Sequence, residues 1–386
     1  MQNYNTGAVP SLTGLRFIAA MMVFFSHFPL PPLHDRLTVI QESGYAGVTF
    51  FFLLSGFILS LNYLDSLSKF SFLSTYNYFV SRFARIYPVY IFCVFFVYFS
   101  RGANGTITTY VLATQAWNPE YWIAFGLVSQ SWSISVEIFL YAMFPLILPL
   151  LHWLKVSSSR FRLILIFIAL VICQFSLAYY FSQSGQGLLH RTNPDSAHHW
   201  LYRFPVTRLL DFSMGITAAI YYRRFLTIDE KTKSVSSFLT YASIVVIILL
   251  MSSGRLLYTP YSFDAMYALP FTILIFSLAV ARHTFASSVL SMPKIVMLGE
   301  ASYALYLLQV IVSSSYVQSP GASSFIWVVN QAFFLALLIA ASIGMHRMVE
   351  KPCQRVIRSV FSIKERARGI YKAQQAPTST DPVVGG

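Results

Sequence analysis

Long apolar stretches separated by short polar segments run along most of this chain. A helix needs about 20 mainly apolar residues to cross a bilayer. Ten stretches come close to this length, namely 12–32, 44–63, 85–101, 132–152, 161–181, 205–222, 236–252, 262–281, 295–315 and 325–346. The pattern therefore predicts an all-α protein, a polytopic bundle of about ten transmembrane helices.

The composition is also typical of a membrane protein. Hydrophobic residues make up 56% of the 386 positions and charged residues only 11%, whereas soluble domains contain about 25% charged residues. The formal net charge is +13, but no polar domain is present to offer a binding face to nucleic acid. We therefore expect the lipid bilayer, and no nucleic acid, as a partner of this chain.

The basic residues indicate the orientation of the bundle. If the ten spans alternate in direction, 21 of the 27 lysines and arginines fall on the side of the N-terminus and six on the other side. Cytoplasmic loops carry the excess of lysine and arginine in membrane proteins. This distribution predicts that both termini are cytoplasmic.

Two regions fall outside the predicted spans. Residues 103–128 are moderately apolar but are interrupted by Asn-Pro-Glu at 118–120, so we expect an extracytoplasmic or re-entrant segment. Residues 1–352 should form one transmembrane domain. Residues 353–386 should form a cytoplasmic tail that is partly disordered, since the chain is polar from about Lys364.

Two ionisable residues, Arg16 and His27, lie in the first predicted span. An ionisable side chain within the bilayer costs roughly 2.5–3.5 kcal/mol on insertion scales, so it indicates a function. The two residues are 11 positions apart, which places them on one helix face and roughly 16 Å apart at ~1.5 Å per residue. A purely structural histidine is the alternative. We interpret the pair as a cation and a general base that bracket a long anionic substrate.

Glu137 and Asp211 have a predicted depth similar to that of His27. Each of the three residues lies about 8–9 Å below the outer end of its span at ~1.5 Å per residue. A carboxylate beside a histidine orients the imidazole and stabilises its protonated form. These three residues are therefore candidate catalytic residues. The structural alternatives are a buried acid at Glu137 and a pair between Asp211 and Arg208.

Arg82 and Arg85 accompany Arg16 near the predicted cytoplasmic ends of the helices. The planar guanidinium group matches phosphate oxygens in pairs, so this cluster is a candidate anion site. The alternative is that Arg82 and Arg85 simply anchor the start of a span at the cytoplasmic interface.

Two further motifs are interpreted as structural or weak. Gly47 and Gly56 lie in an aromatic run, where small residues favour close helix packing. His198 and His199 are adjacent on a predicted outer loop, which is a poor spacing for a metal site. We therefore expect no metal cofactor.

Several motifs occur together and in order along almost the whole chain. They are the Arg-x10-His pair within LTGLRFIAAMMVFFSH, then GVTFFFLLSGFILS, RFARIYPVY, WSISVEIFLYAMFP and LGEASYALYLLQ. With these motifs the chain resembles the acyltransferase 3 family of multi-span membrane acyltransferases. One departure is Gln309, where many members of that family have histidine.

The resemblance implies an O-acyltransferase of the bacterial plasma (inner) membrane. Members of the family use acyl-coenzyme A, usually acetyl-coenzyme A, as a cytoplasmic donor substrate. Their acceptors are saccharide hydroxyls of lipopolysaccharide, exopolysaccharide, peptidoglycan or small glycosides, some of them lipid-linked. The residues implied in contacts with the donor are Arg16, Arg82, Arg85, Ser133, Ser302 and Tyr303.

The resemblance also implies a role for His27. It would either deprotonate the acceptor hydroxyl or be acylated itself before transfer, with Glu137 orienting it or balancing its charge. A proton-coupled transporter of a small polar solute is the main alternative, because intramembrane ionisable residues also mark proton relays. Paired broken spans in two matching halves, the usual sign of such transporters, are not evident.

Overall fold

The computed structural model describes residues 9–31, 35–101, 107–313 and 323–363. Within these residues every regular element is helical, and no strand is present. The α-helices are α1 (Pro10–His27), α2 (Asp35–Glu42), α3 (Gly47–Leu67), α4 (Phe72–Arg101), α5 (Ile107–Val111), α6 (Tyr121–Phe125), α7 (Trp132–Trp153), α8 (Arg160–Gln183), α9 (Pro205–Arg224), α10 (Glu230–Met251), α11 (Ala265–Val280), α12 (Phe285–Leu290), α13 (Pro293–Glu300), α14 (Ser302–Ser313), α15 (Ser324–Met345) and α16 (Lys351–Phe361).

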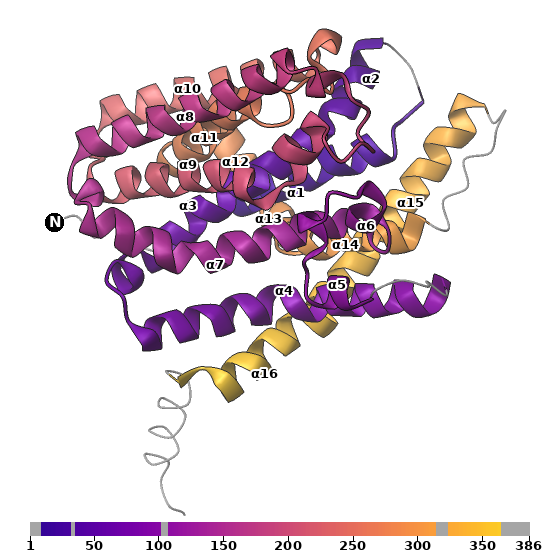
Figure 1. Cartoon of the computed structure of the whole chain (residues 1–386), viewed down its shortest axis with the longest axis horizontal. Coiled ribbons are helices and arrows are strands. Elements are labelled where there is room, and N and C mark those ends of the chain that lie inside the picture. The colour runs from indigo at the N-terminus through magenta and orange to yellow at the C-terminus, as the bar shows by residue number, and fades with distance from the viewer. Residues whose placement is uncertain (1–8, 32–34, 102–106, 314–322, 364–386) are drawn as a thin grey trace, which may run out of the picture.

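The long helices form a bundle in which most axes run side by side. In Figure 1 helices α3, α4, α7, α8 and α10 extend along the long axis of the molecule, whereas α15 and α16 cross it obliquely. A π-helical turn at His346–Glu350 joins α15 to α16. The all-α prediction is therefore confirmed.

Six helical stretches among the described residues are long and apolar enough to cross a membrane, or seven if the bent pair α13–α14 counts as one span. Each predicted span overlaps a helix, but the predicted count of ten is not confirmed. The remaining predicted spans fall on α1 and α9, which contain ionisable residues, and on α11, which has only 16 residues.

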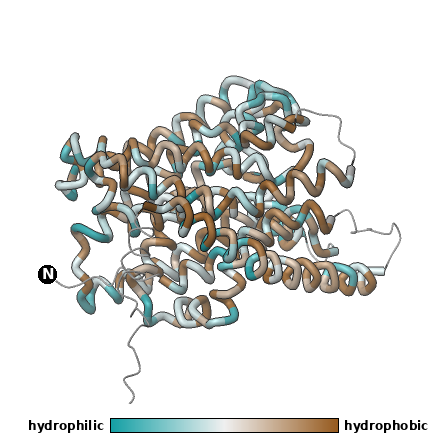
Figure 2. The backbone as a smooth tube through the Cα atoms, turned by 90° about the horizontal axis from the view of Figure 1, so that it is seen from below, coloured by the Kyte–Doolittle hydropathy of each residue, from teal (hydrophilic) through white to brown (hydrophobic). Residues whose placement is uncertain are grey.

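The outer helices present apolar side chains to the surroundings. Exposed examples on α8, α10 and α15 are Ile168, Ile172, Phe175, Phe238, Val245, Leu249, Phe325, Phe333 and Leu337. Hydrophobic segments run along most of the helices, and hydrophilic ones are most evident near the ends of the bundle (Figure 2). A soluble protein does not expose apolar surface on this scale, so these faces are suited to lipid contact.

Helices α3 and α9 pack backbone against backbone through two glycines. A Cβ atom on Gly56 would lie 2.1 Å from the carbonyl oxygen of Phe212, and one on Gly215 would lie 2.1 Å from that of Leu53. At Gly47 a Cβ atom would lie 2.7 Å from the carbonyl oxygen of Ala19. The predicted close packing at Gly47 and Gly56 is therefore confirmed, and it holds α1, α3 and α9 at short separations.

Gly56→Ala is expected to destabilise the protein by about 1–3 kcal/mol, because the added methyl group has no room beside a backbone carbonyl. Thermal unfolding of purified protein in detergent measures the effect. Gly344→Ala is the matched control, since a Cβ atom there meets nothing within 4 Å. Equal stability of the two variants would contradict the tight α3–α9 contact.

Two predicted boundaries need correction. Helix α4 begins at Phe72 rather than near residue 85, so Arg82 and Arg85 lie well inside a helix and not at its start. The residues before Arg82 include several polar ones, so they lack the continuous apolar run from which a span is predicted. The helix nevertheless extends through them. The predicted span 295–315 is broken at Ala301, where α13 and α14 meet at 59°.

The described part of residues 103–128 contains no spanning helix, in agreement with the prediction that this region does not form a full membrane span. It forms only the short helices α5 and α6 and a 3-10 turn. Its backbone is supported from within the protein, since Gln115 Nε2 donates to Ser131 O at 2.7 Å and Arg203 Nη1 donates to Asn118 O at 2.7 Å.

The predicted tail is helical where the structure describes it. Residues 353–361 belong to α16, which packs against α4. The predicted disorder falls on residues 364–386, which lie outside the described residues.

Candidate active site

A large cavity occupies the centre of the bundle. It has a volume of about 1020 Å³ and lies between α1, α3, α4, α7 and α14, with α9 and α10 at one end. Its polar and charged lining residues are Thr13, Arg16, Ser55, Asn62, Arg82, Arg85, Ser133, Glu137, Tyr141, Tyr222, Arg223, Glu230, Lys233, Arg282, His283, Ser302, Tyr303 and Tyr306. All six predicted donor-binding residues and Glu137 are among them.

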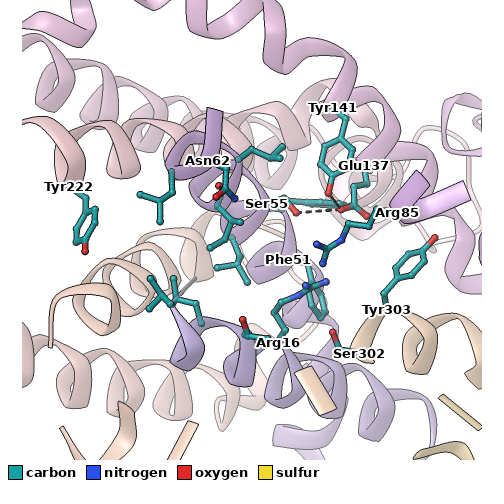
Figure 3. A pocket seen from close by; sticks show the side chains of 18 of the residues that line it. Arg16, Phe51, Ser55, Asn62, Arg85, Glu137, Tyr141, Tyr222, Ser302 and Tyr303 are labelled. Atoms are coloured by element: carbon teal, nitrogen blue, oxygen red, sulfur yellow. Dashed lines mark hydrogen bonds between the residues drawn. The ribbon is translucent and has the colours of Figure 1, made fainter. Parts of the chain in front are cut away.

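Three arginines, which we call the deep arginines, face the interior of this cavity: Arg16, Arg82 and Arg85. The guanidinium groups of Arg16 and Arg85 point toward one another across the cavity (Figure 3). Among the described residues no carboxylate oxygen lies within 4.0 Å of any of the three. Like charges that converge without a direct salt bridge form a site for an anionic or strongly polar ligand.

Aromatic rings hold Arg82 in place. Its guanidinium carbon lies 5.6 Å from the ring centroid of Tyr63 and 5.9 Å from that of Tyr141. Its Nη2 also donates to the hydroxyl of Tyr63 at 3.4 Å. These cation–π contacts fix the cation without neutralising it.

Glu137 forms a hydrogen-bonded cluster with two hydroxyl groups. Tyr141, one turn further along α7, and Ser55 of α3 both donate to its Oε1, the latter at 3.4 Å. Figure 3 shows these bonds beside Arg85. Ser133, Glu137 and Tyr141 recur at intervals of four residues, so α7 presents one polar face to the cavity.

The break between α13 and α14 brings the start of α14 to the cavity wall. Ser302 Oγ donates to Gly299 O at 2.8 Å and Tyr303 OH donates to Ile86 O at 2.8 Å. Tyr306 OH and Ser133 Oγ lie 2.7 Å apart. The oxygen atoms of these hydroxyls can still accept hydrogen bonds from a ligand, and a helix N-terminus adds a partial positive charge.

His27 lies beyond the cavity. On α1 the lining residues end at Arg16. Farther along the same helix Ala20, Val23 and Phe24 are buried, and the ring of Phe24 stacks on that of Phe334 in α15. His27 ends α1 with an exposed side chain whose Nδ1 lies 2.8 Å from Val23 O.

The predicted grouping of His27 with Glu137 and Asp211 is therefore not present in this structure. Among the described residues no carboxylate oxygen lies within 4.0 Å of the His27 ring. Counting depth along separate spans ignores how far each helix is displaced along its axis and which way its side chains face.

Asp211 belongs to a separate buried ionic cluster. Arg208 Nη1 lies 2.9 Å from Asp211 Oδ2 and 3.2 Å from Asp264 Oδ1, and Gln174 Nε2 donates to both aspartates at 2.8 and 3.0 Å. Arg208 and Asp211 are fully buried, and Asp211 does not line the cavity. The structure therefore agrees with the structural alternative for Asp211, which is its ion pair with Arg208.

The adjacent histidines His198 and His199 are enclosed by other groups. The ring of His198 lies among those of Tyr121, Phe125, Tyr202 and Phe263. Burial, followed by the charges of nearby arginines, lowers the pKa of His198 to about 3, so its ring is neutral at physiological pH. Within the described ranges no three His, Cys, Asp or Glu side chains are placed to hold a metal ion.

Sequence reasoning missed several lining residues. Tyr141 could have been found, because it is four residues from Glu137 on one helix. No such signal marks Ser55, which helix packing brings to the cavity. The same holds for the cations Arg223, Lys233 and Arg282, which reach the cavity from the ends of three different helices.

Comparison with known proteins identifies the family of this chain. Residues 9–345 match the family described as an acyltransferase domain. The chain belongs to the acyltransferase 3 family. No solved structure matches it significantly.

Several named relatives agree with this family assignment. The chain is 28% identical over 384 residues to the acyltransferase MdmB of Streptomyces mycarofaciens, covering 90% of this chain and 92% of the relative. It is 26% identical to a putative acetyltransferase ORF330 of Acidianus two-tailed virus, covering 77% of this chain and 81% of the relative. It is 22% identical to the O-acetyltransferase OatA of Staphylococcus aureus strain NCTC 8325, covering 95% of this chain but 61% of that protein. The chain is therefore an acyltransferase with a multi-pass membrane architecture.

Proposed function

We propose that this acyltransferase moves an acetyl group from acetyl-coenzyme A, bound from the cytoplasmic side of a bacterial inner membrane, to a hydroxyl group of a saccharide. The observation that carries the proposal is the charge of the central cavity. Six cationic and two anionic side chains line it, in addition to His283. A phosphate monoester carries about −1.5 to −2 charges at neutral pH, so a donor with three phosphate groups complements this excess.

The shape of the cavity also suits a long donor. Helix α3 lines it from Val48 to Asn62, a distance of about 21 Å at ~1.5 Å per residue. A thin acyl-pantetheine arm needs such a depth, whereas a compact substrate does not. Arg16, Arg82, Arg85, Ser133, Ser302 and Tyr303 would supply hydrogen bonds to this donor.

The acceptor assignment draws on the named relatives. One of them, in Listeria monocytogenes, is a peptidoglycan O-acetyltransferase that is 27% identical over 42% of this chain. A saccharide hydroxyl is a poor nucleophile until a base removes its proton, so O-acetylation of a glycan requires a general base. The outer end of α1, where His27 is exposed, is open to an acceptor on the side opposite the predicted cytoplasmic face.

We propose His27 as that base. The acceptor oxygen would attack the thioester carbonyl, forming the ester C–O bond as the C–S bond breaks. The hydroxyl proton would pass to His27 and then to the coenzyme A thiolate. Acylation of His27 followed by transfer to the acceptor is the second form of the same role. In either form the acetyl group must pass the buried stretch at Ala20, Val23 and Phe24, so these residues would separate from their neighbours during turnover.

Arg16→Gln is expected to weaken the binding of coenzyme A by about 10- to 100-fold, because a charge-assisted hydrogen bond contributes roughly 1.5–3 kcal/mol. Equilibrium binding to purified protein in lipid discs measures this loss. The matched control is Arg160→Gln at the start of α8, an exposed arginine that does not line the cavity. If the wild-type protein did not bind coenzyme A, the assignment of the donor would be wrong.

A further inference from the structure

One end of the cavity carries a second group of cations, which we call the mouth cations. They are Arg223 at the end of α9, Lys233 in α10 and Arg282, which follows α11. Arg282 is exposed, so the cavity reaches the molecular surface at this end. The basic residues of the chain predict this side to be cytoplasmic, and a soluble anion that enters from there meets the mouth cations first.

The mouth cations are separated from the deep arginines along α3. Arg223 Nη1 donates to Leu61 O at 3.1 Å, whereas the Glu137 cluster bonds to Ser55. Six residues separate these two positions, or about 9 Å at ~1.5 Å per residue. Figure 3 shows Tyr222, the neighbour of Arg223, on one side of the cavity and Arg16 with Arg85 on the other. The cavity therefore has two cationic regions rather than one.

The mouth cations are available to an incoming anion. Arg223 Nη2 lies 2.6 Å from Asp65 Oδ2 and Lys233 Nζ lies 2.7 Å from Glu230 Oε1, but these carboxylate side chains are 76% and 90% exposed. Exposed ion pairs contribute little, about 0–1 kcal/mol, so a phosphate group can replace either carboxylate. Among the described residues no carboxylate oxygen lies within 4.0 Å of Arg282.

Along α3 the wall between the two regions is apolar, since the lining residues between Ser55 and Leu61 are Ile58 and Leu59. Further apolar residues that line the cavity are Leu12, Phe51, Phe52, Leu54, Ile86 and Ile134. Multiply charged phosphates lose much of their hydration among such side chains, and they lose less at an open mouth lined by cations. An uncharged arm loses little hydration free energy in either place. A donor with one charged and one neutral half is therefore expected to bind with its charged half at the mouth and its neutral half deeper in the cavity.

We propose that the mouth cations bind the phosphates of the nucleotide half of the acyl donor, whereas the deep arginines contact the carbonyl groups of its pantetheine half. The assignment rests on the proposed use of acetyl-coenzyme A. It changes the expected role of Arg16, Arg82 and Arg85, which no longer hold phosphates but donate hydrogen bonds to the pantetheine arm.

Fragments of the donor test the proposal. The probes are adenosine 3′,5′-bisphosphate and pantetheine, measured with intact coenzyme A by equilibrium binding to the full chain in lipid discs. The double variant Lys233→Ala/Arg282→Ala is expected to bind the bisphosphate and coenzyme A at least about tenfold more weakly, with little change for pantetheine. Arg16→Ala is expected to weaken the binding of pantetheine and coenzyme A but not of the bisphosphate.

Controls separate a local effect from general damage. Lys231→Ala removes an exposed cation from the same helix that does not line the cavity, so binding should not change. Lys233→Arg keeps the positive charge at this position, so it should retain most of the affinity for the bisphosphate and coenzyme A. Unchanged binding of the bisphosphate to the double variant, or its loss in Arg16→Ala alone, would overturn the subsite. Failure of the wild-type protein to bind coenzyme A would instead overturn the proposed donor.

Discussion

His27→Ala is expected to abolish acetyl transfer while leaving the binding of coenzyme A unchanged. A general base contributes about 10²–10⁴-fold to the rate of a reaction, and a role as acyl carrier would contribute at least as much. Because His27 lies beyond the cavity, its loss should not alter the donor site. The measurement compares acetyl-coenzyme A turnover and coenzyme A binding for the same preparation in lipid discs.

A second histidine provides the control for this result. His190 is exposed in the segment between α8 and α9 and bonds only locally, with Nδ1 2.8 Å from Thr192 Oγ1. His190→Ala should therefore retain full turnover. Turnover that persists in His27→Ala would sink the assignment of the base. Turnover and binding lost together would show that His27 supports the structure of the donor site instead.

The helices and the arginine-rich half of the site could be predicted from the sequence. Apolar runs report helices directly, because each run must satisfy its own backbone hydrogen bonds in lipid. Arg16 is recognisable because an arginine within an apolar helix is costly and so indicates a function. Arg82 and Arg85 are recognisable because guanidinium groups that cluster near cytoplasmic helix ends suit an anion. Their convergence on one cavity is a consequence of α1 and α4 flanking α3.

The partners of these residues could not be predicted in the same way. The sequence shows the spacing within one helix, as for Glu137 and Tyr141, but not the rotation of one helix against another. That rotation depends on contacts such as Gly56 against the backbone of α9, which a single sequence does not reveal. Asp211 was consequently grouped with His27 on the basis of depth alone, although its side chain faces Arg208.

The mouth of the cavity illustrates a different limit. Arg223, Lys233 and Arg282 read as ordinary cytoplasmic anchors, because loops on that side of a membrane protein are basic in general. Only their placement around one opening distinguishes them from Lys231, which has the same charge and lies on the same helix. Charge counting predicts on which side of the membrane an anion is attracted, whereas the position of an opening on that side is seen only in the structure.

Arg208→Met is expected to destabilise the protein by about 3–5 kcal/mol, because it removes the cation from the buried acid pair Asp211 and Asp264. Arg208 Nη2 also donates to Phe263 O at 2.8 Å, so the variant frees a buried carbonyl group as well. Methionine has a similar length and fills most of the space, which limits any cavity term. Thermal unfolding in detergent measures the loss.

The charge of the cluster, rather than its packing, should cause this loss. Adding Asp264→Asn to Arg208→Met replaces one of the two buried acids by a neutral amide and is expected to restore part of the stability. Asp65→Asn breaks an ion pair of 2.6 Å whose carboxylate side chain is 76% exposed, so it should cost less than about 1 kcal/mol. If Arg208→Met were as stable as Asp65→Asn, the ionic cluster would not hold α9 to α11. If the second substitution gave no recovery, the loss would come from packing.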